Sequence, residues 1–505
     1  MRLNQTADDL AAWQMQRLRG YLANVVIPFS AHYRELWKRQ GIEPGDIRNW
    51  YDWSQVPFTS KEDLLPSPEN PEKTRGFIII PDEAALRHRP STIARGVLTG
   101  RERTKSALER EFRPVFMTLT TGRSADPVPF FYTMHDIDRL RECGRRIMEY
   151  GASRADWRHL NAFPFAPHLG FWQVHHATDA FGAFSVNTGG GKVMGTAGNV
   201  AMFAKVMPEV LIGMPTFVYH LLQEAVRTGV RQPKLVKLVL GGEKVPDGMR
   251  RKLRALCAEL GADRVDVQAT YAFTEAKMAW IECPFPEGEA SGGYHLYPDL
   301  AIVEIIDPQT GVPVGPGQPG EIVFTPLDAR GSVVLRYRTG DRIDGGLVEG
   351  PCPHCGRNLP RLVGRISRVS EVRNLHFDKL KGTLVNFNDL EHVLDDVPGI
   401  GAWQIEILKH NDDPLDCDEL VVHVHRTGRA GKDELRRIIG DKFVLATEIS
   451  PNRIDFHEAD ELRELQGVGV ALKEEKIVDH RPRANSVKTE GKIEHESVLK
   501  ESSPH

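Results

Sequence analysis

The sequence has little of several features that would define its class. Six cysteines in 505 residues are too few for a disulfide-bonded scaffold. No apolar run approaches the ~20 residues that a membrane-spanning helix needs. The net charge of −4 offers no positive excess to attract nucleic acid or an anionic membrane. The amino-terminal segment is polar and lacks the apolar stretch of a secretory signal. These absences favour a reduced, cytoplasmic protein with neither nucleic acid nor a membrane as its partner.

The composition that is present is typical of a soluble globular protein. Hydrophobic residues make up 41% and charged residues 27% of the chain, which are ordinary proportions. A single hydrophobic core stops growing near ~250–300 residues. A chain of 505 residues is therefore expected to form at least two domains.

Short apolar runs alternate with helical stretches from about residue 112 onward, which predicts an α/β fold with a parallel sheet. The expected strands in this part are 210–214, 238–240 and 265–267, and the helices between them are 216–228 and 247–260. Residues 7–40 predict helix, and 41–75 predict loops and short helices. The strands expected between 300 and 370 are 301–306, 321–325 and 332–338.

The last part of the chain predicts a smaller α+β unit. Its expected elements are helix 388–396, strands 402–408 and 419–425, and helix 431–440. We expect a large, multi-subdomain N-terminal α/β region over residues 1–366 and a small, mobile α+β lid domain over 367–505.

A loop rich in hydroxyl groups, FMTLTTGRSADPV, follows an apolar run. Thr118, Thr120, Thr121 and Gly122 supply hydroxyls and exposed backbone N–H groups, which can hold phosphate oxygens. Arg123 can add a charge-assisted contact. The segment does not match the Walker pattern, and by itself it is more typical of an ordinary Ser/Thr turn.

Four further motifs follow in order: LGGE ending at Glu243, YAFTE ending at Glu275, YRTGD ending at Asp341, and GR ending at Arg365. Together with the TTG of the hydroxyl-rich loop, they resemble the acyl-adenylate-forming (AMP-binding) superfamily, in particular its phenylacetate–CoA ligase branch. The resemblance covers nearly the whole chain. Other stretches similar to this branch are HYRELWKRQGI, VPFTSKEDL, SVNTGGG, CGRNLPRLVGR and EGKIEH.

The chain departs from the family pattern at four places. Leu119 stands where the family usually has glycine, and Arg123 stands where it has lysine. Ala272 replaces the glycine of the family's YGLTE motif. Arg365 is followed by Ile-Ser-Arg368 instead of the usual acidic hinge pair.

The resemblance implies roles for the polar residues of these motifs. Glu275 would hold a Mg²⁺ ion that bridges the phosphates of ATP, and Thr274 would bind phosphate. Asp341 would accept hydrogen bonds from both ribose hydroxyls, which suits an ionised carboxylate. Without the resemblance, Glu275 is equally a strand-end carboxylate, and Asp341 is a turn residue after Gly340.

The resemblance also implies an adenine pocket lined by Gly241, Gly242 and Glu243, with Tyr271 stacking on the base. Arg365 would contact the nucleotide close to the domain boundary.

The same resemblance implies that the catalytic lysine is Lys492, within EGKIEH. It would stabilise negative charge as a carboxylate attacks the α-phosphate. Lys488 lies four residues earlier, and both lysines are otherwise typical of a solvated tail.

The segment FPFAPHLGFW is aromatic and rich in glycine and proline, and it predicts the acid pocket. Phe163, Gly170 and Phe171 would line a flat apolar pocket, which favours an aryl or arylacetic acid. His168 can meet a carboxylate or serve as a hydrogen-bonded structural histidine. Gly189 resembles a glycine turn of the same branch and would close this region.

The sequence Cys352-Pro-His-Cys355 is typical of a zinc knuckle, which supplies two of four ligands. Some members of the phenylacetate–CoA ligase branch hold zinc with a cysteine and a histidine that follow the YGLTE-type motif, so the resemblance implies Cys283 and His295 as the other two. Such a closed four-ligand site is structural. Free thiols are the alternative.

The sequence thus predicts a ligase. A carboxylic acid and ATP would give an acyl-adenylate, and coenzyme A would then take the acyl group as a thioester. The expected cofactors are ATP, Mg²⁺, coenzyme A and structural Zn²⁺, and homodimer formation is left open. Alternatives are transfer to a carrier-protein thiol or an amine, a non-catalytic nucleotide- or acyl-binding homologue, and a zinc ribbon for nucleic acid, which the acidic charge disfavours.

Overall fold

The structure, a computed structural model, describes residues 6–68, 70–120, 127–368, 372–378, 381–410, 417–447, 449–468 and 474–481. The chain divides into two compact units. The larger unit comprises Met1–Val372, Asn386–Asp396 and Gly467–Glu474, and the smaller comprises Arg373–Val385, Val397–Gln466 and Glu475–His505. A domain boundary after residue 366 stays a prediction.

The N-terminal segment is helical over residues 7–40 as predicted, but a break at Ser30 divides it. It consists of α1 (Ala7–Tyr21), a π-helical turn (Leu22–Val26), α2 (Ile27–Phe29) and α3 (Ala31–Gln40). Pro28 cannot donate to a preceding turn. Ser30 leaves the helical region (φ −91°, ψ 120°) and caps α3 by accepting a hydrogen bond from the Tyr33 amide. Its own hydroxyl donates to the Gly76 carbonyl at 2.8 Å.

Residues 41–75 form short helices and loops, as predicted from their polar and proline-rich sequence. The helices from here to residue 112 are α4 (Trp50–Ser54), α5 (Lys61–Leu64), a 3₁₀ turn (Lys73–Phe77), α6 (Glu83–Arg87), α7 (Pro90–Thr99) and α8 (Arg101–Phe112).

The central sheet of the larger unit has six strands in the order β4-β3-β5-β6-β7-β8. They are β3 (Arg158–Asn161), β4 (Phe184–Asn187), β5 (Val210–Gly213), β6 (Lys237–Leu240), β7 (Asp266–Phe273) and β8 (Met278–Ile281). The first five strands are parallel, and only β8 is antiparallel to its neighbour. The prediction of a parallel α/β sheet is therefore confirmed.

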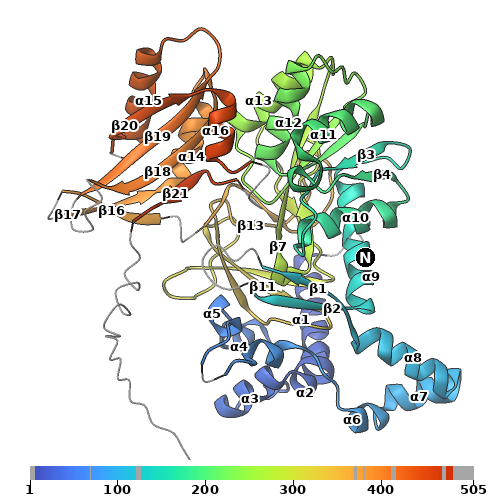
Figure 1. Cartoon of the computed structure of the whole chain (residues 1–505). Coiled ribbons are helices and arrows are strands. Elements are labelled where there is room, and N and C mark those ends of the chain that lie inside the picture. The colour runs from blue at the N-terminus through green and yellow to red at the C-terminus, as the bar shows by residue number, and fades with distance from the viewer. Residues whose placement is uncertain are drawn as a thin grey trace, which may run out of the picture. The chain divides into compact units, whose positions relative to one another are not determined.

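Five helices accompany this sheet: α9 (Met134–Tyr150), α10 (Leu169–Phe181), α11 (Gly191–Val206), α12 (Pro215–Arg227) and α13 (Asp247–Glu259). Figure 1 shows α9 and α10 side by side. A Cβ atom at Gly144 of α9 would lie 2.5 Å from the Ala177 Cα of α10. Only glycine permits this approach of the two helices.

Antiparallel sheets form the part of the chain between residues 300 and 370 that the sequence predicted to be rich in strands, and one further antiparallel pair precedes it. One pair is β1 (Pro114–Leu119) with β2 (Pro129–Thr133). A four-stranded sheet has the order β10 (Ala301–Ile306), β11 (Gly320–Pro326), β12 (Tyr337–Ile343) and β15 (Ile366–Arg368). A small sheet orders β13 (Leu347–Val348), β14 (Arg361–Leu362) and β9 (Tyr294–His295).

The predicted strand over 332–338 begins only at Tyr337. Arg336 adopts a positive φ of 43°, which is incompatible with a strand. The preceding residues pair elsewhere: Ser332 forms a bridge with Ile78, and the Val333 amide donates to the Phe77 carbonyl.

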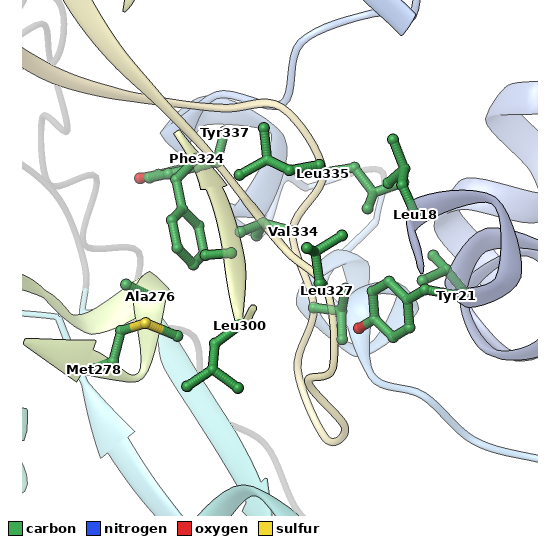
Figure 2. Close-up of a cluster of buried hydrophobic side chains, with 14 of the residues drawn as sticks. Leu18, Tyr21, Ala276, Met278, Leu300, Phe324, Leu327, Val334, Leu335 and Tyr337 are labelled. Carbon is green, nitrogen blue, oxygen red and sulfur yellow. The ribbon is translucent and has the colours of Figure 1, made fainter. Parts of the chain in front are cut away.

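The hydrophobic core joins the N-terminal helices to the strand-rich region. Figure 2 shows Leu18 and Tyr21 of α1 facing Leu327 and Leu335. Phe324 of β11 lies on the other side of the cluster, and its ring meets that of Phe273 edge-on at 5.3 Å. Strand β7, which Glu275 follows, is thereby packed against β11, the neighbour of the strand β12 that carries the YRTGD motif.

The smaller unit contains β16 (Val372–Asp378, whose first residue belongs to the larger unit) with β17 (Lys381–Asn386), and a sheet of order β20-β19-β18-β21. Its other elements are β18 (Ile400–Lys409), β19 (Asp418–Arg426), β20 (Arg453–His457), β21 (Ile477–Asp479), α15 (Lys432–Thr447) and α16 (Ala459–Leu465). Helix α14 (Phe387–Asp396) groups with the larger unit. Within the described ranges, no helix has the length and apolar character that crossing a bilayer requires.

Candidate active site

The predicted nucleotide motifs lie at the carboxyl ends of neighbouring parallel strands. Gly241 follows β6 directly, and Thr274 and Glu275 follow β7 in a 3₁₀ turn, Thr274–Ala276. In open α/β sheets, ligands bind outside the carboxyl ends of the strands. Asp341, the last residue of the YRTGD motif, lies on β12 of the four-stranded antiparallel sheet.

Two tyrosine hydroxyls link the YAFTE and YRTGD motifs crosswise. The Tyr271 hydroxyl of the first motif donates to Asp341 Oδ2 of the second at 2.9 Å. The Tyr337 hydroxyl of the second motif donates to Glu275 Oε1 of the first at 2.7 Å. The two partners are 70 and 62 residues apart in sequence. We call this arrangement the crossed brace; it holds both carboxylates in fixed positions.

The buried setting keeps both tyrosines protonated. Burial raises the pKa of Tyr271 well above its ordinary value, and the negative charge of Asp341 raises it further. Burial and the charge of Glu275 raise the pKa of Tyr337 in the same way. Each phenol therefore remains a hydrogen-bond donor at neutral pH, and each carboxylate remains an acceptor.

Glu275 itself is electrostatically strained. Burial raises the pKa of its carboxyl group above the ordinary value, although the hydrogen bond from Tyr337 and the charge of Arg368 act in the opposite direction. The nearby charge of Asp341 also raises it. A cation next to Glu275 would relieve the cost of two carboxylates in one buried site.

The Gly-Gly-Glu turn is shaped by its neighbours. A Cβ atom at Gly241 would collide with the Thr270 hydroxyl, and Gly242 has a φ of +83°. Glu243 accepts hydrogen bonds from the backbone amide of Thr216 at 3.1 Å and from its hydroxyl at 2.8 Å. Its side chain thus anchors the start of α12. A Cβ atom at Gly241 would also lie 3.5 Å from the Phe163 ring, and one at Gly242 would lie 3.8 Å from it.

The described ends of the phosphate loop are held by their own hydroxyl groups. Thr118 lies within β1, where its Oγ1 is 3.1 Å from the Tyr132 hydroxyl. Thr120 Oγ1 accepts a hydrogen bond from the Val128 amide at 2.9 Å, which closes the neck of the loop. Thr121, Gly122 and Arg123 lie outside the described residues, so their phosphate contacts stay a prediction.

The predicted acid-pocket residues gather around the Phe163 ring. A Cβ atom at Gly170 would lie 3.2 Å from this ring, and one at Gly242 would lie 3.8 Å from it. Gly189 accepts a hydrogen bond from the Phe165 amide at 3.1 Å, which ties the glycine turn to the aromatic segment.

Three other aromatic rings of this segment, those of Phe165, Phe171 and Trp172, cluster with the ring of Phe116. Trp172 meets Phe116 at 5.1 Å, Phe171 at 5.3 Å and Phe165 at 5.9 Å between ring centroids. Phe165 is 59% exposed although its neighbours are packed. The cluster therefore presents an apolar aromatic wall that a flat ring can join.

His168 contacts the backbone at the phosphate loop. Its Nδ1 lies 2.8 Å from the Leu119 carbonyl oxygen, and a carbonyl can only accept. Nδ1 therefore carries the proton and donates, which leaves Nε2 as an acceptor in the neutral ring. A neutral His168 in this tautomer cannot donate to a substrate carboxylate.

Arg365 is placed differently from the other motif residues. Arg365 pairs with Asp344 through its Nε at 3.0 Å and through its backbone amide at 2.6 Å, and its side chain is 63% exposed. Lys492 lies outside the described residues, so its catalytic role stays a prediction.

The four predicted zinc ligands converge. One ligand atom from each of Cys283, His295, Cys352 and Cys355 lies within 4.8 Å of all the others. Cys283 Sγ is 3.6 Å from Cys352 Sγ, and Cys355 Sγ is 3.5 Å from His295 Nε2. Tetrahedral zinc, with bonds of about 2.3 Å to sulfur and about 2.0–2.1 Å to nitrogen, requires separations of about 3.8 and 3.6 Å. The spacing therefore fits one zinc ion.

Local backbone geometry brings these ligands together. The Gly356 amide donates to the Cys352 carbonyl at 2.9 Å, and Gly356 itself has a φ of +69°. This tight turn places both cysteines of the knuckle on one side. His295 ends β9 and pairs with Arg361 of β14 in the small sheet. A Cβ atom at Gly292 would lie 2.8 Å from Cys352 Sγ, so a larger residue there would displace a ligand.

The electrostatics of the cluster suit a metal. Burial lowers the pKa of His295 to about 4, helped by nearby arginines, so the imidazole is neutral as metal binding requires. Burial and the neighbouring thiols raise the pKa of Cys283. For Cys352 burial acts in the same direction, but backbone N–H groups of Cys355 and His354 outweigh it and lower the pKa. Several thiolates can coexist in so small a space only with a cation between them.

The matched family and the geometry agree on the class of protein. The family described as AMP-binding enzyme matches residues 152–326, which include the central parallel sheet, the Gly-Gly-Glu turn and Glu275. Residues 152–326 thus resemble the AMP-binding enzymes, the acyl-adenylate-forming family that the motifs of the sequence also indicate.

Within this superfamily, the chain is similar to phenylacetate–coenzyme A ligases. It is 26% identical to that of Aromatoleum evansii over 376 residues, 73% of each chain. It is also 26% identical to that of Thermus thermophilus over 423 residues, 83% of this chain and 82% of the relative. A solved structure of 2-hydroxyisobutyryl-CoA ligase in the postadenylation state superposes with a TM-score of 0.71. It covers 94% of this chain and 91% of its own at 18% identity, and it supports the same fold.

Two residues of the site were missed by sequence reasoning. Tyr337 was treated only as the start of the YRTGD motif, although its hydroxyl holds Glu275. Arg368 was noted only as a departure from the hinge pattern, although its Nε lies 2.8 Å from Asp341 Oδ1. For Tyr337 a signal was available, because a tyrosine begins both the YAFTE and the YRTGD motif. No local signal pointed to the second.

Proposed function

We propose that this chain is an AMP-forming acyl-CoA ligase. It would condense a carboxylic acid with ATP to an acyl-adenylate, release pyrophosphate, and transfer the acyl group to coenzyme A. The crossed brace between the YAFTE and YRTGD motifs is the observation that carries the proposal. It holds one carboxylate for a metal–phosphate complex and another for a ribose, as a nucleotide-dependent reaction requires.

The residues of the chain would divide the chemistry between binding and charge stabilisation. Asp341 would accept the ribose hydroxyls, and Gly241 and Gly242 would let the flat adenine approach the backbone. A Mg²⁺ ion held by Glu275 would neutralise phosphate charge. Thr274 and the hydroxyls of the phosphate loop would orient the phosphates, so that the acid carboxylate reaches the α-phosphorus in line with the leaving pyrophosphate.

We further propose that the acid is an aryl or arylacetic acid. Phe163 beside Gly170 and the interlocked rings of Phe171 and Trp172 support a flat apolar pocket. The relatives named phenylacetate–coenzyme A ligases support the same class. Because His168 Nδ1 is engaged by the Leu119 carbonyl oxygen, we propose that His168 positions the phosphate loop and leaves the acid to other groups.

Pyrophosphate exchange into ATP, measured over a panel of carboxylic acids, tests the proposal. We expect exchange with aryl or arylacetic acids and little with short aliphatic acids. AMP release that depends on coenzyme A would identify the acceptor, whereas release that depends on a carrier protein or an amine would support the neighbouring alternatives. ATP binding without exchange for any acid would support a non-catalytic homologue and end the proposal.

The catalytic lysine can be tested with a matched pair of variants. We expect Lys492→Ala to reduce pyrophosphate exchange by roughly 100-fold or more, because a charge that stabilises the transition state is lost. Lys488→Ala, the same change four residues earlier, should leave exchange unchanged. The assignment is wrong if the two variants exchange their effects.

We also propose that Cys283, His295, Cys352 and Cys355 hold a structural zinc ion. The closed set of four ligands leaves no open position for a substrate. The ion would link the end of β8 to the small β13-β14-β9 sheet. Strand β8 is the neighbour of β7, which carries Tyr271 and is followed by Glu275.

A further inference from the structure

We infer that Arg368, and not the motif residue Arg365, is the positioning arginine of the nucleotide site, where it orients the Asp341 carboxylate for a ribose. The inference rests on the proposed function, because it assigns Asp341 to the ribose. It adds a residue that lies where the family usually has an acidic hinge residue.

The strand register places Arg368 opposite Asp341. Arg368 is the last residue of β15, and the antiparallel pairing of β12 with β15 sets Asp341 directly across from it. Opposite charges at such a cross-strand position attract each other. Arg368 Nε lies 2.8 Å from Asp341 Oδ1, and the Tyr271 hydroxyl lies 2.9 Å from Oδ2. One donor on each oxygen fixes the plane of the carboxylate.

The exposure of the two side chains differs in a way that suits a binding site. The Asp341 side chain is only 7% exposed, whereas that of Arg368 is 54% exposed. The carboxylate is thus held in the protein, while the guanidinium borders solvent. A carboxylate can accept roughly four hydrogen bonds, so donors from the protein and from a ribose can share it.

The charge of Arg368 acts on both carboxylates of the crossed brace. The charge of Asp341 is the main cause of a raised pKa for Arg368; burial opposes it, and Tyr271 and Glu275 add to it. Conversely, Arg368 lowers the pKa of Glu275 while Asp341 raises it. The guanidinium therefore offsets the repulsion between the two acids.

Arg365 provides a natural comparison. It is three residues away, equally arginine and similarly exposed, but it pairs with Asp344 through both its backbone and its side chain. If proximity to the hinge were sufficient for ribose recognition, loss of either arginine would have the same effect on nucleotide binding. If contact with Asp341 decides, only Arg368 matters for ribose recognition.

The test measures dissociation constants of ATP and 2′-deoxy-ATP by calorimetry for the wild type and for Arg368→Ala, Arg368→Lys and Arg365→Ala. We expect Arg368→Ala to weaken ATP binding about tenfold and 2′-deoxy-ATP binding clearly less, so that discrimination between the nucleotides falls. Arg368→Lys should restore part of the discrimination, because it returns the charge. Arg365→Ala should change the discrimination between the two nucleotides less than Arg368→Ala does, and all four proteins should melt at similar temperatures.

Three outcomes would overturn the inference. Equal effects of Arg368→Ala and Arg365→Ala would remove the distinction between the arginines. An equal loss of affinity for both nucleotides would show that Arg368 does not act through the ribose. A wild type that binds neither nucleotide would end the inference together with the nucleotide site. Pyrophosphate exchange by the wild type, measured separately, reports on the proposed function: intact exchange with no loss of discrimination in Arg368→Ala refutes the inference alone.

Discussion

Glu275→Gln is expected to reduce pyrophosphate exchange by roughly 100-fold or more, since the removed charge would hold Mg²⁺ at the phosphates. Glutamine retains the shape and can still accept the hydrogen bond from Tyr337, so the crossed brace should survive. Exchange is measured at saturating acid over a range of Mg²⁺ concentrations. Glu209→Gln is the matched control. Glu209 precedes β5 at the opposite, amino end of the same sheet, where it pairs with Arg158 at 2.8 Å, and this variant should exchange normally.

The same carboxylate predicts a dependence on pH. Because burial raises the pKa of Glu275, the group takes up a proton at a higher pH than an exposed glutamate does. Protons and Mg²⁺ then compete for it. We expect the pH below which the exchange rate falls to decrease as the Mg²⁺ concentration increases. This shift should be absent in Glu275→Gln. If the fall of the exchange rate at acid pH did not depend on Mg²⁺, a group other than Glu275 would control it.

Loss of activity in Glu275→Gln should not come from unfolding. A carboxyl group with a raised pKa in the folded protein stabilises the fold below its ordinary pKa, and this contribution is lost as the pH rises through the raised value. Above that raised pKa the charge of Glu275 is a cost to the fold, and glutamine removes it. The melting temperature of Glu275→Gln at pH 7 should equal or exceed that of the wild type. A large decrease would mean that the brace itself had been broken.

Cys283→Ala is expected to lose bound zinc and to lower the melting temperature by roughly 5–10 °C, at about 2–4 °C for each kcal/mol. Structural zinc contributes about 10–16 kcal/mol of binding free energy in small zinc modules. Even a small part of this is large compared with the stability of a domain. Zinc content by elemental analysis, after purification without chelator, and thermal unfolding are the two measurements.

Cys257→Ala is the matched control for the zinc prediction. Cys257 is a fully buried thiol of α13 outside the cluster, so its removal leaves only a small cavity, at a cost of about 1 kcal/mol. It should keep one equivalent of zinc. A chelator should lower the melting temperature of the wild type and of Cys257→Ala, but have little further effect on Cys283→Ala. The zinc assignment fails if the wild type holds no zinc and its cluster thiols react freely with thiol reagents.

The parallel sheet and most of its helices could be predicted because their signals are local. The apolar runs before Gly241 and Thr274 are short, and the helical repeats between them are long, which is sufficient to recognise alternating strands and helices. The interruption at Ser30 was missed because an apolar helical pattern continues across it. A cap and a proline decide such a break, and the pattern of hydrophobic residues does not register them.

The candidate site was predicted unevenly for a related reason. Cys352 and Cys355 are close in sequence, so their role could be read from spacing. Cys283 and His295 needed the family resemblance, because the turn that brings them to the knuckle is set by packing. The pairing of the tyrosine donors with Glu275 and Asp341 could not be read from the sequence, although a tyrosine begins each motif. The donors come from 62 and 70 residues away, and no periodicity links positions at that separation.

The sequence by itself determined which chemical groups the protein possesses and in which order, and hence the family, the parallel sheet and the donor set for a metal. Only the tertiary structure decided how these groups pair: Tyr271 with Asp341, Tyr337 with Glu275, and Arg368 rather than Arg365 with Asp341. The physical reason is that a motif specifies side-chain chemistry over a few residues, whereas hydrogen bonds and ion pairs depend on distances of about 3 Å. Strand register and turn geometry set those distances between segments that are remote in the chain.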